Sequence, residues 1–277
     1  MCVSMAPARF SGTTLYIGRR DHPAHGLIHV LGYQNSAANL ADGPNAMLLH
    51  LPSARPMTPD NFISVGRSET ILSRMVDALR PVAPAAPGSM DWMGGAPRGA
   101  AVRVFDHDVY TVLLAEDATL IPAALSRVPH RKRPQLDPTL MEFYSGHYPD
   151  HTIALCCFDN PQARRAKPLL LWYHPLDDQL LTAPALDCHT GGPPDLTADV
   201  PVDHWVIFGT DDAPDDWGTP VTYPADVTPA LRSYLPTRIT GAHLTDTHLP
   251  NGDFALAHDH LLTSGPDHVY RSSPTPS

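Results

Sequence analysis

Proline and glycine punctuate this chain so densely that long helices are not expected. Its 277 residues include 31 prolines and 18 glycines. Proline removes a backbone donor that the interior of a helix needs, and both residue types favour turns. Because 43 % of the residues are hydrophobic, the chain can still bury a sizeable core. A globular protein built from many short elements is therefore predicted.

Short runs of β-branched, aromatic and aliphatic residues predict a fold rich in strands. Residues 13–18 and 27–34 form a predicted hairpin around a turn at 21–26. Further strands are expected at 45–51, 102–105, 109–115, 152–158, 169–173, 180–186, 204–209, 239–244 and 254–258. The best helical pattern covers 68–79, and weaker ones cover 120–128, 138–144 and 228–235. Strands and helices do not alternate regularly, so the fold class is α+β with largely antiparallel sheets and a few helices.

The domain organisation follows from the spacing of these elements. A single α+β domain over residues 1–262 is the simplest reading, with a boundary near 146–151 as the alternative. The segment 81–100 contains many prolines and glycines without periodicity, which indicates either a lid over a site or a tether. Residues 263–277 are rich in proline and serine and are expected to form a disordered tail.

Charge and cysteine usage restrict the partners and the compartment. The formal net charge is −10, with 19 basic and 29 acidic residues, so nucleic acid is not an expected partner. No apolar run is long enough to span a membrane, and the N-terminal sequence lacks a signal-peptide pattern. Four cysteines without a C-x-x-C pair indicate reduced thiols. These features predict a soluble, cytoplasmic protein, and they leave its oligomeric state open.

Cys2 is the sharpest chemical candidate in the sequence. Removal of Met1 before this small residue would leave an α-amine beside the thiol. The two groups have reference pKa values near 8 and 8.5, so together they form a nucleophile with its own base. The alternative reading is an ordinary cysteine on a frayed terminus.

The first 21 residues carry a resemblance to a known family. Met1-Cys2-Val3-Ser4, followed by Tyr16-x-Gly18-Arg19-Arg20-Asp21, resembles the opening of N-terminal-nucleophile amidohydrolases of the choloylglycine hydrolase type. In this chain Asp21 follows Arg19 by two positions, where the family has three. The resemblance implies a four-layer αββα fold, catalytic roles for Cys2, Arg19 and Asp21, and hydrolysis of an amide through a covalent thioester.

Two further groups of residues could complete such a site. Asp187 and His189 are two positions apart, so on a strand they face the same side, and an adjacent carboxylate can orient a histidine that acts as a general base. A simple turn with an exposed histidine is the alternative. Asn35 and Asn45 lie near predicted strand ends, where their amides could stabilise an oxyanion or merely support turns.

Metal binding is a weaker interpretation of the 16 histidines. His22, His25 and His29, and separately His258 and His260, lack the spacing of a recognised signature, so no metal and no cofactor are predicted. Cys156 and Cys157 lie in an apolar strand and are expected to be core residues. Three functions remain: hydrolysis of an amide in a small molecule or peptide through Cys2, a non-enzymatic β-rich binding or scaffold protein, and a metal-dependent hydrolase.

The segment 81–100 gives a first testable prediction. Few of its backbone groups can enter a ladder, so limited proteolysis should cut within it before cutting elsewhere. A lid over a single domain predicts that the two fragments stay together after the cut, as measured by size-exclusion chromatography. Separation into two independently stable fragments would support the tether instead.

Overall fold

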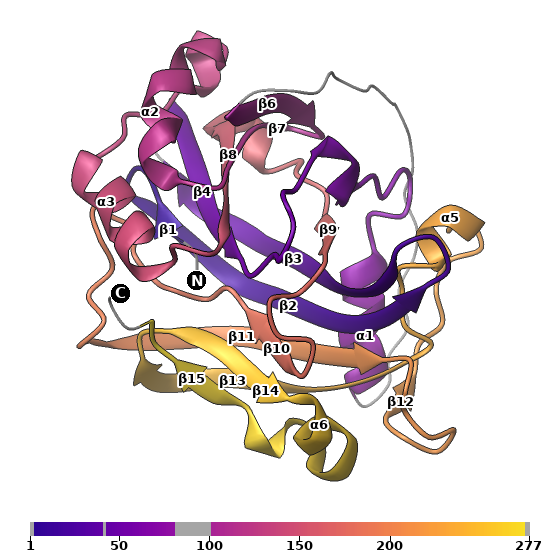
Figure 1. The fold of residues 1–277 in the computed structure, drawn as a ribbon. Helices are drawn as coiled ribbons and strands as arrows, with labels where there is room; N and C mark the ends of the chain where they lie inside the picture. Colours follow the sequence, from indigo (N-terminus) through magenta and orange to yellow (C-terminus); the bar gives the residue numbers. More distant parts are fainter. Residues whose placement is uncertain (1–2, 41–42, 81–100, 275–277) are drawn as a thin grey trace.

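Two β-sheets packed face to face form the centre of the protein (Figure 1). The computed structural model describes residues 3–40, 43–80 and 101–274. A seven-stranded sheet has the order β12-β13-β11-β2-β3-β9-β5, and a five-stranded sheet has the order β1-β4-β8-β7-β6. A smaller three-stranded sheet, β10-β14-β15, lies beside them. The predicted loop at 81–100 lies outside the described residues.

The elements are short except for the hairpin near the N-terminus. The strands are β1 (Val3–Ser4), β2 (Ala8–His22), β3 (Gly26–Leu40), β4 (Pro44–Leu51), β5 (Phe62–Ile63), β6 (Val102–His107), β7 (Tyr110–Ala115), β8 (Thr152–Asp159), β9 (Leu169–Tyr173), β10 (Leu180–Ala183), β11 (Asp199–Thr210), β12 (Thr219–Pro220), β13 (Arg238–Pro250), β14 (Asp253–Ala257) and β15 (Tyr270–Ser272). The α-helices are α1 (Ile71–Leu79), α2 (Ile121–Ala124), α3 (Pro138–His147), α4 (Asn160–Ala163), α5 (Pro229–Arg232) and α6 (His258–Ser264). In the described part of the chain, the 3-10 helices are η1 (Pro59–Asn61), η2 (Ala118–Leu120), η3 (Leu125–Arg127), η4 (His130–Lys132) and η5 (Gly265–His268).

The pairing confirms the predicted class, α+β with largely antiparallel sheets and few helices. Antiparallel ladders join the neighbouring strands, with one parallel ladder between β2 and β11. The predicted hairpin is present as β2 and β3, but both strands run further than expected. Within the described ranges, no helix combines the length and the apolar character that a membrane crossing requires.

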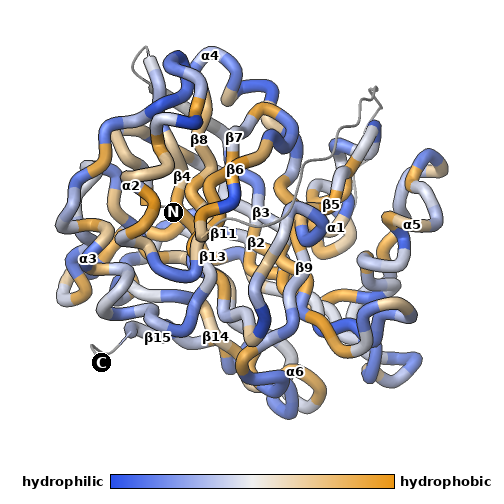
Figure 2. The backbone as a smooth tube through the Cα atoms, turned by 45° about the horizontal axis from the view of Figure 1, so that its top comes forward, coloured by the Kyte–Doolittle hydropathy of each residue, from blue (hydrophilic) through white to orange (hydrophobic). Residues whose placement is uncertain are grey.

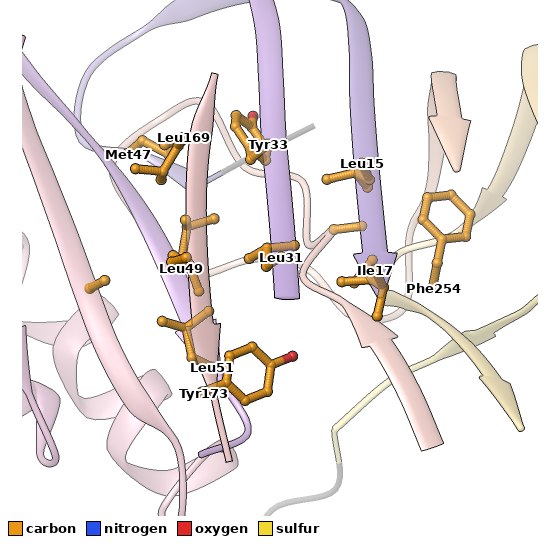
Figure 3. Packing of buried hydrophobic residues seen from close by; sticks show 14 of the residues in the cluster. Leu15, Ile17, Leu31, Tyr33, Met47, Leu49, Leu51, Leu169, Tyr173 and Phe254 are labelled. Carbon is orange, nitrogen blue, oxygen red and sulfur yellow. The ribbon is translucent and has the colours of Figure 1, made fainter. Parts of the chain in front are cut away.

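The main core lies between the two large sheets (Figure 3). In β4, Met47, Leu49 and Leu51 point into this core, whereas Ala46 and Leu48 belong to a second cluster on the opposite face. The alternation follows from the two-residue period of a strand. Because both faces of β4 are buried, its residues read as a continuous apolar run, which explains why its strand character was visible in the sequence.

Helices cover the outer faces of both sheets. Side chains of α2 and α3 pack on the five-stranded sheet in the second cluster. On the other side α1 and α5 pack on the seven-stranded sheet, and the buried residues of α1 are Ile71, Leu72, Met75 and Val76, a stripe with helical spacing. The layers therefore follow the order helix, sheet, sheet, helix. Figure 2 shows hydrophobic segments along the central strands and hydrophilic segments in the outer turns.

The expected disorder of residues 263–277 is wrong for most of that segment. Gly265–His268 forms η5, and β15 pairs with β14. Arg271 fixes the pairing, because its Nε donates to the carbonyl of Pro250 at 2.8 Å and its guanidinium lies 4.3 Å from the centre of the Phe254 ring. The proline and serine content alone suggested disorder, because composition does not show which distant residues a segment contacts.

His29 provides a prediction about the dependence of stability on pH. It is fully buried in β3 between paired residues of β2 and β9. Burial, and next the charge of Arg19, lower its pKa to about 4. In the unfolded chain its pKa is near 6.5, so between these values only the unfolded state takes up the proton. The contribution of His29 to the free energy of unfolding is therefore fully present above about pH 6.5 and is lost progressively as the pH falls towards about 4.

Replacing His29 with Gln should flatten this dependence by about one proton, which corresponds to about 1.4 kcal/mol per pH unit. The measurement is the free energy of urea unfolding at several pH values across this window. His248→Gln is the matched control, since His248 is exposed. Identical slopes for the His29 variant and the unmodified protein would contradict the assignment.

Candidate functional site

The N-terminal segment lies directly against the segment that carries Asp187 and His189. Val3 forms a parallel bridge with Cys188, and the backbone N–H of Ser4 donates to the carbonyl of Cys188 at 2.9 Å. Gly191 allows this close packing: its φ is +86°, and a Cβ there would lie 2.6 Å from the carbonyl oxygen of Met5. A side chain at Gly191 would therefore separate the two segments.

Three contacts hold the ring of His189. Its Nε2 lies 2.8 Å from Oδ1 of Asp187 in an ion-pair contact, although the N–H does not point along a hydrogen-bond direction. Its Nδ1 lies 3.3 Å from Oγ of Ser4. The ring of Phe10 packs against the imidazole, with 5.4 Å between the ring centres. The predicted pairing of Asp187 with His189 is thus present, and the imidazole has one fixed orientation.

Ser4 supports the ring and is not accessible to a substrate. It is fully buried, and its hydroxyl donates to the carbonyl of Ala6 at 2.9 Å. The same oxygen lies 3.3 Å from Nδ1 of His189, so Ser4 holds the ring at the nitrogen that Asp187 does not contact.

Asn45 fixes the chain just beyond Ser4. Its side chain is fully buried, and its Oδ1 accepts from the backbone N–H of Ala6 at 3.0 Å and from that of Ala46 at 2.8 Å. Its Nδ2 donates to the carbonyl of Ala6 at 3.4 Å. The carbonyl oxygen and one N–H of this amide are therefore engaged by the backbone, and in this structure Asn45 positions the N-terminal segment.

Asn251 and Asp253 fix the other side of the site. Oδ1 of Asn251 accepts from the N–H of Asp187 at 2.9 Å, and its Nδ2 donates to the carbonyl of Asp187 at 3.0 Å. Asp253 accepts from the N–H of Ala185 at 2.8 Å and from Nε2 of His50 at 2.7 Å. Burial raises the pKa of Asp253, but the His50 charge and these hydrogen bonds outweigh burial and lower it overall. Sequence reasoning missed this support, for which the Asn-Gly-Asp triplet at 251–253 was the available signal.

A groove opens beside His189. Its volume is about 670 Å³, and residues of β2, β11 and β13 line it together with Asp187 and His189. Asp203 and Asp246 add two more carboxylates, while Arg9 is the one lysine or arginine among the described lining residues. His204 also lines the groove, and burial is the main cause that lowers its pKa to about 2. A ligand in this groove would meet a predominantly acidic surface with His189 at its edge.

The remaining predicted site residues lie elsewhere or outside the described residues. Cys2 falls outside them. Arg19 is bound to Asp212 and to the carbonyl of Asp178, and it lies about 35 Å along β2 from Ala8. Asp21 is exposed near the same hairpin end. Asn35 donates to the hydroxyl of Tyr33 at 2.9 Å and lines a different cavity. The structure therefore brings Asp187, His189 and Asn45 to the N-terminal segment, and it does not bring Arg19, Asp21 or Asn35 there.

The other histidines and cysteines considered from the sequence either pack against neighbouring side chains or lie in the core. His22 and His25 stack on each other with 4.5 Å between ring centres, and Nε2 of His258 lies 3.1 Å from the hydroxyl of Thr210. Over the described ranges, no group of three or more His, Cys, Asp or Glu side chains is arranged to hold a metal ion. Cys156 and Cys157 are fully buried, as predicted, and burial raises the pKa of both thiols.

Comparisons with known proteins give distant structural similarity alone. No family model matches the chain, and no curated protein matches it. The chain is similar to the crystal structure of baculovirus P35, with a TM-score of 0.46 and 10 % identity over 93 % of this chain and 92 % of that one. A mutated baculovirus P35 after caspase cleavage gives a TM-score of 0.41 and 14 % identity over 72 % of this chain and 65 % of that one.

The role of Asn45 can be tested by amide exchange. Asn45→Ala removes the acceptor for the Ala6 N–H, so the protection of that amide should fall, together with stability, by about 1–3 kcal/mol. Hydrogen–deuterium exchange and urea unfolding measure the two effects. Asn35→Ala is the matched control, because the Asn35 amide contacts Tyr33 and should leave Ala6 unchanged. Equal Ala6 protection in both variants would mean that Asn45 does not anchor the segment.

Proposed function

We propose that this protein hydrolyses an amide bond of a small molecule or peptide, with Cys2 as nucleophile, His189 as general base and acid, and Asp187 as the group that orients His189. One observation carries this proposal: the strand that follows Cys2 pairs directly with the segment that holds the Asp187–His189 pair. Ser4, two residues after Cys2 in the sequence, lies 3.3 Å from Nδ1 of His189 through its Oγ.

The proposed chemistry needs no group beyond these residues and water. His189 takes the proton of the Cys2 thiol, and the thiolate sulfur attacks the carbonyl carbon of the amide. The C–N bond then breaks, His189 gives its proton to the leaving amine, and a thioester remains on Cys2. Water attacks the thioester, with its proton passing to His189 and then to the departing sulfur. The carboxylic acid product is released, and the thiol of Cys2 and the imidazole of His189 are regenerated, so the cycle is balanced.

Cys2 is preferred to Ser4 as the nucleophile because the Ser4 hydroxyl is buried and engaged with Ala6. Arg19 and Asp21 are left out of the proposed site, since they lie towards the far end of β2. The carboxylate of Asp187 stabilises the imidazolium that forms when His189 accepts a proton. Asn45 and Asn251 act through the backbone segments that they hold and are positioning residues.

A binding protein without catalysis is the second candidate function. The specific observation that favours it is the open groove of about 670 Å³ at the same place, a volume in the range of ligand sites. Both candidates use this groove, and they differ in whether Cys2 reacts. The reactivity of Cys2 therefore discriminates between them.

If Cys2 is the nucleophile, its thiolate should be present near neutral pH. A limiting dose of iodoacetamide at about pH 7 should alkylate Cys2 well before Cys156 and Cys157, which are buried, and before Cys188. Peptide mass spectrometry follows the rate at each cysteine against pH. The midpoint for Cys2 should lie clearly below about 8.5, the reference value of a free thiol.

Two variants separate pairing from simple exposure. His189→Ala should move the Cys2 midpoint towards the reference value, because the base that stabilises the thiolate is lost. His248→Ala removes another histidine of the same groove and should leave the midpoint in place. An unperturbed Cys2 titration in the unmodified protein and in both variants would reject the hydrolase and favour the binding protein.

A further inference from the structure

The groove lies where two strands of the seven-stranded sheet part. The parallel ladder between β2 and β11 runs from Thr13 and His204 to Arg19 and Thr210. Both strands begin earlier, β2 at Ala8 and β11 at Asp199, and over those residues they pair only with their other neighbours, β3 and β13. Residues 8–11 of β2 and 201–203 of β11 therefore line the groove without a ladder between them.

A bulge accompanies the end of this ladder on each side, with the extra residue in β2 itself where it pairs with β3 and in β13 where that strand pairs with β11. The β2–β3 register shifts between Ser11 and Thr14, around Gly12 with a φ of +58°. The β11–β13 register shifts between Val202 and His204, opposite Asp246 with a φ of +54°. An extra residue bends its strand and increases the local twist. The two register shifts lie at the end of the β2–β11 ladder, so the opening coincides with the irregular part of the sheet.

Next to the last ladder pair, a side chain bridges β2 and β11 in place of a backbone hydrogen bond. The backbone N–H of Gly12 donates to Oδ2 of Asp203 at 2.9 Å. Below this bond, Ala8, Arg9, Phe10 and Ser11 of β2 face Pro201 and Val202 of β11 across the groove. The β2 edge spans about 13 Å and the β11 edge about 10 Å at about 3.3 Å per extended residue.

We propose that an extended peptide segment with basic side chains binds in this groove as an additional strand between β2 and β11. Main-chain hydrogen bonds to a sheet edge give affinity, and side-chain contacts give selectivity. Pro201 has no N–H to offer to a bound peptide. The charge of the groove selects the side chains, because Asp187, Asp203 and Asp246 outnumber Arg9.

The bound peptide would be the substrate of the proposed hydrolase, and only its cleavage, not its binding, rests on the proposed function. A peptide lying along the edge of β2 passes His189, which contacts Phe10 on that strand. The scissile amide would then come from the peptide backbone itself. Binding can be measured without turnover, so the two proposals can fail separately.

The test uses the full chain and a fluorescent nonapeptide of alternating threonine and lysine, whose lysines share one face when extended. Fluorescence anisotropy should show saturable binding that weakens as salt is added. A peptide with glutamate in place of lysine should not bind. The lysine peptide with N-methyl groups on alternate residues should also not bind, because it keeps the charge but cannot complete a ladder.

Two protein variants locate the site. Asp246→Asn removes one groove charge while keeping a residue that tolerates positive φ, and it should weaken binding by about two- to fivefold. Asp226→Asn removes an exposed charge at another cavity and should leave binding unchanged. Hydrogen exchange of the complex should show new protection at Arg9–Ser11.

The outcomes separate the two proposals. Equal binding of the N-methylated peptide, equal effects of the two charge variants, or no binding of the lysine peptide would overturn the strand addition. Peptide binding by anisotropy and the alkylation rate of Cys2 are both measured on the unmodified protein, so the two properties are scored separately. An unreactive Cys2 together with intact binding would reject the hydrolase and keep the peptide site.

Discussion

The parallel pairing of β2 with β11 joins the first hairpin of the chain to its last third, and both the sheet and the site depend on it. Parallel strands need a crossover connection. Here the connection runs from β3 to β10 and includes every strand of the five-stranded sheet except β1. Strands from both halves of the sequence therefore share the central sheets. The same ladder stops at Thr13 and His204, which opens the groove.

Polar groups buried at the ends of strands determine how the segments around this groove meet. Asn45 holds the N-terminal segment, and Asn251 holds the backbone of Asp187. Asp253 contacts His50 of β4 as well as the chain just before Asp187. Buried amides and carboxylates are stable only when their hydrogen bonds are made. The segments on both sides of the site are thus held by side-chain to backbone bonds, and the Asp253–His50 contact joins β14 of the three-stranded sheet to β4 of the five-stranded sheet.

The sequence predicted most elements, because strands buried on both faces, such as β4 and β8, read as continuous apolar runs. It underestimated β2 and β3, since their outer portions carry polar residues around Gly12. At the site, the two-residue spacing identified Asp187 and His189, whose contact is local. Ser4, Phe10 and Asn251 could not be predicted, because their roles depend on segments far away in the chain. The motif around Arg19 and Asp21 failed to mark the same site, since a long strand separates it from the N-terminal segment.

The long crossover also has a consequence for the synthesis of this protein. Roughly 190 residues separate Thr13 from its partner His204, and a ribosome needs about 10 to 40 s to add that many at typical elongation rates. For most of this interval, from the synthesis of β3 onward, the β2–β3 hairpin has been made while its partner strand has not. An unpaired edge invites association with other chains, and charged side chains oppose this. Until β11 emerges, Arg9, Arg19 and Arg20 give β2 three positive charges that oppose such association.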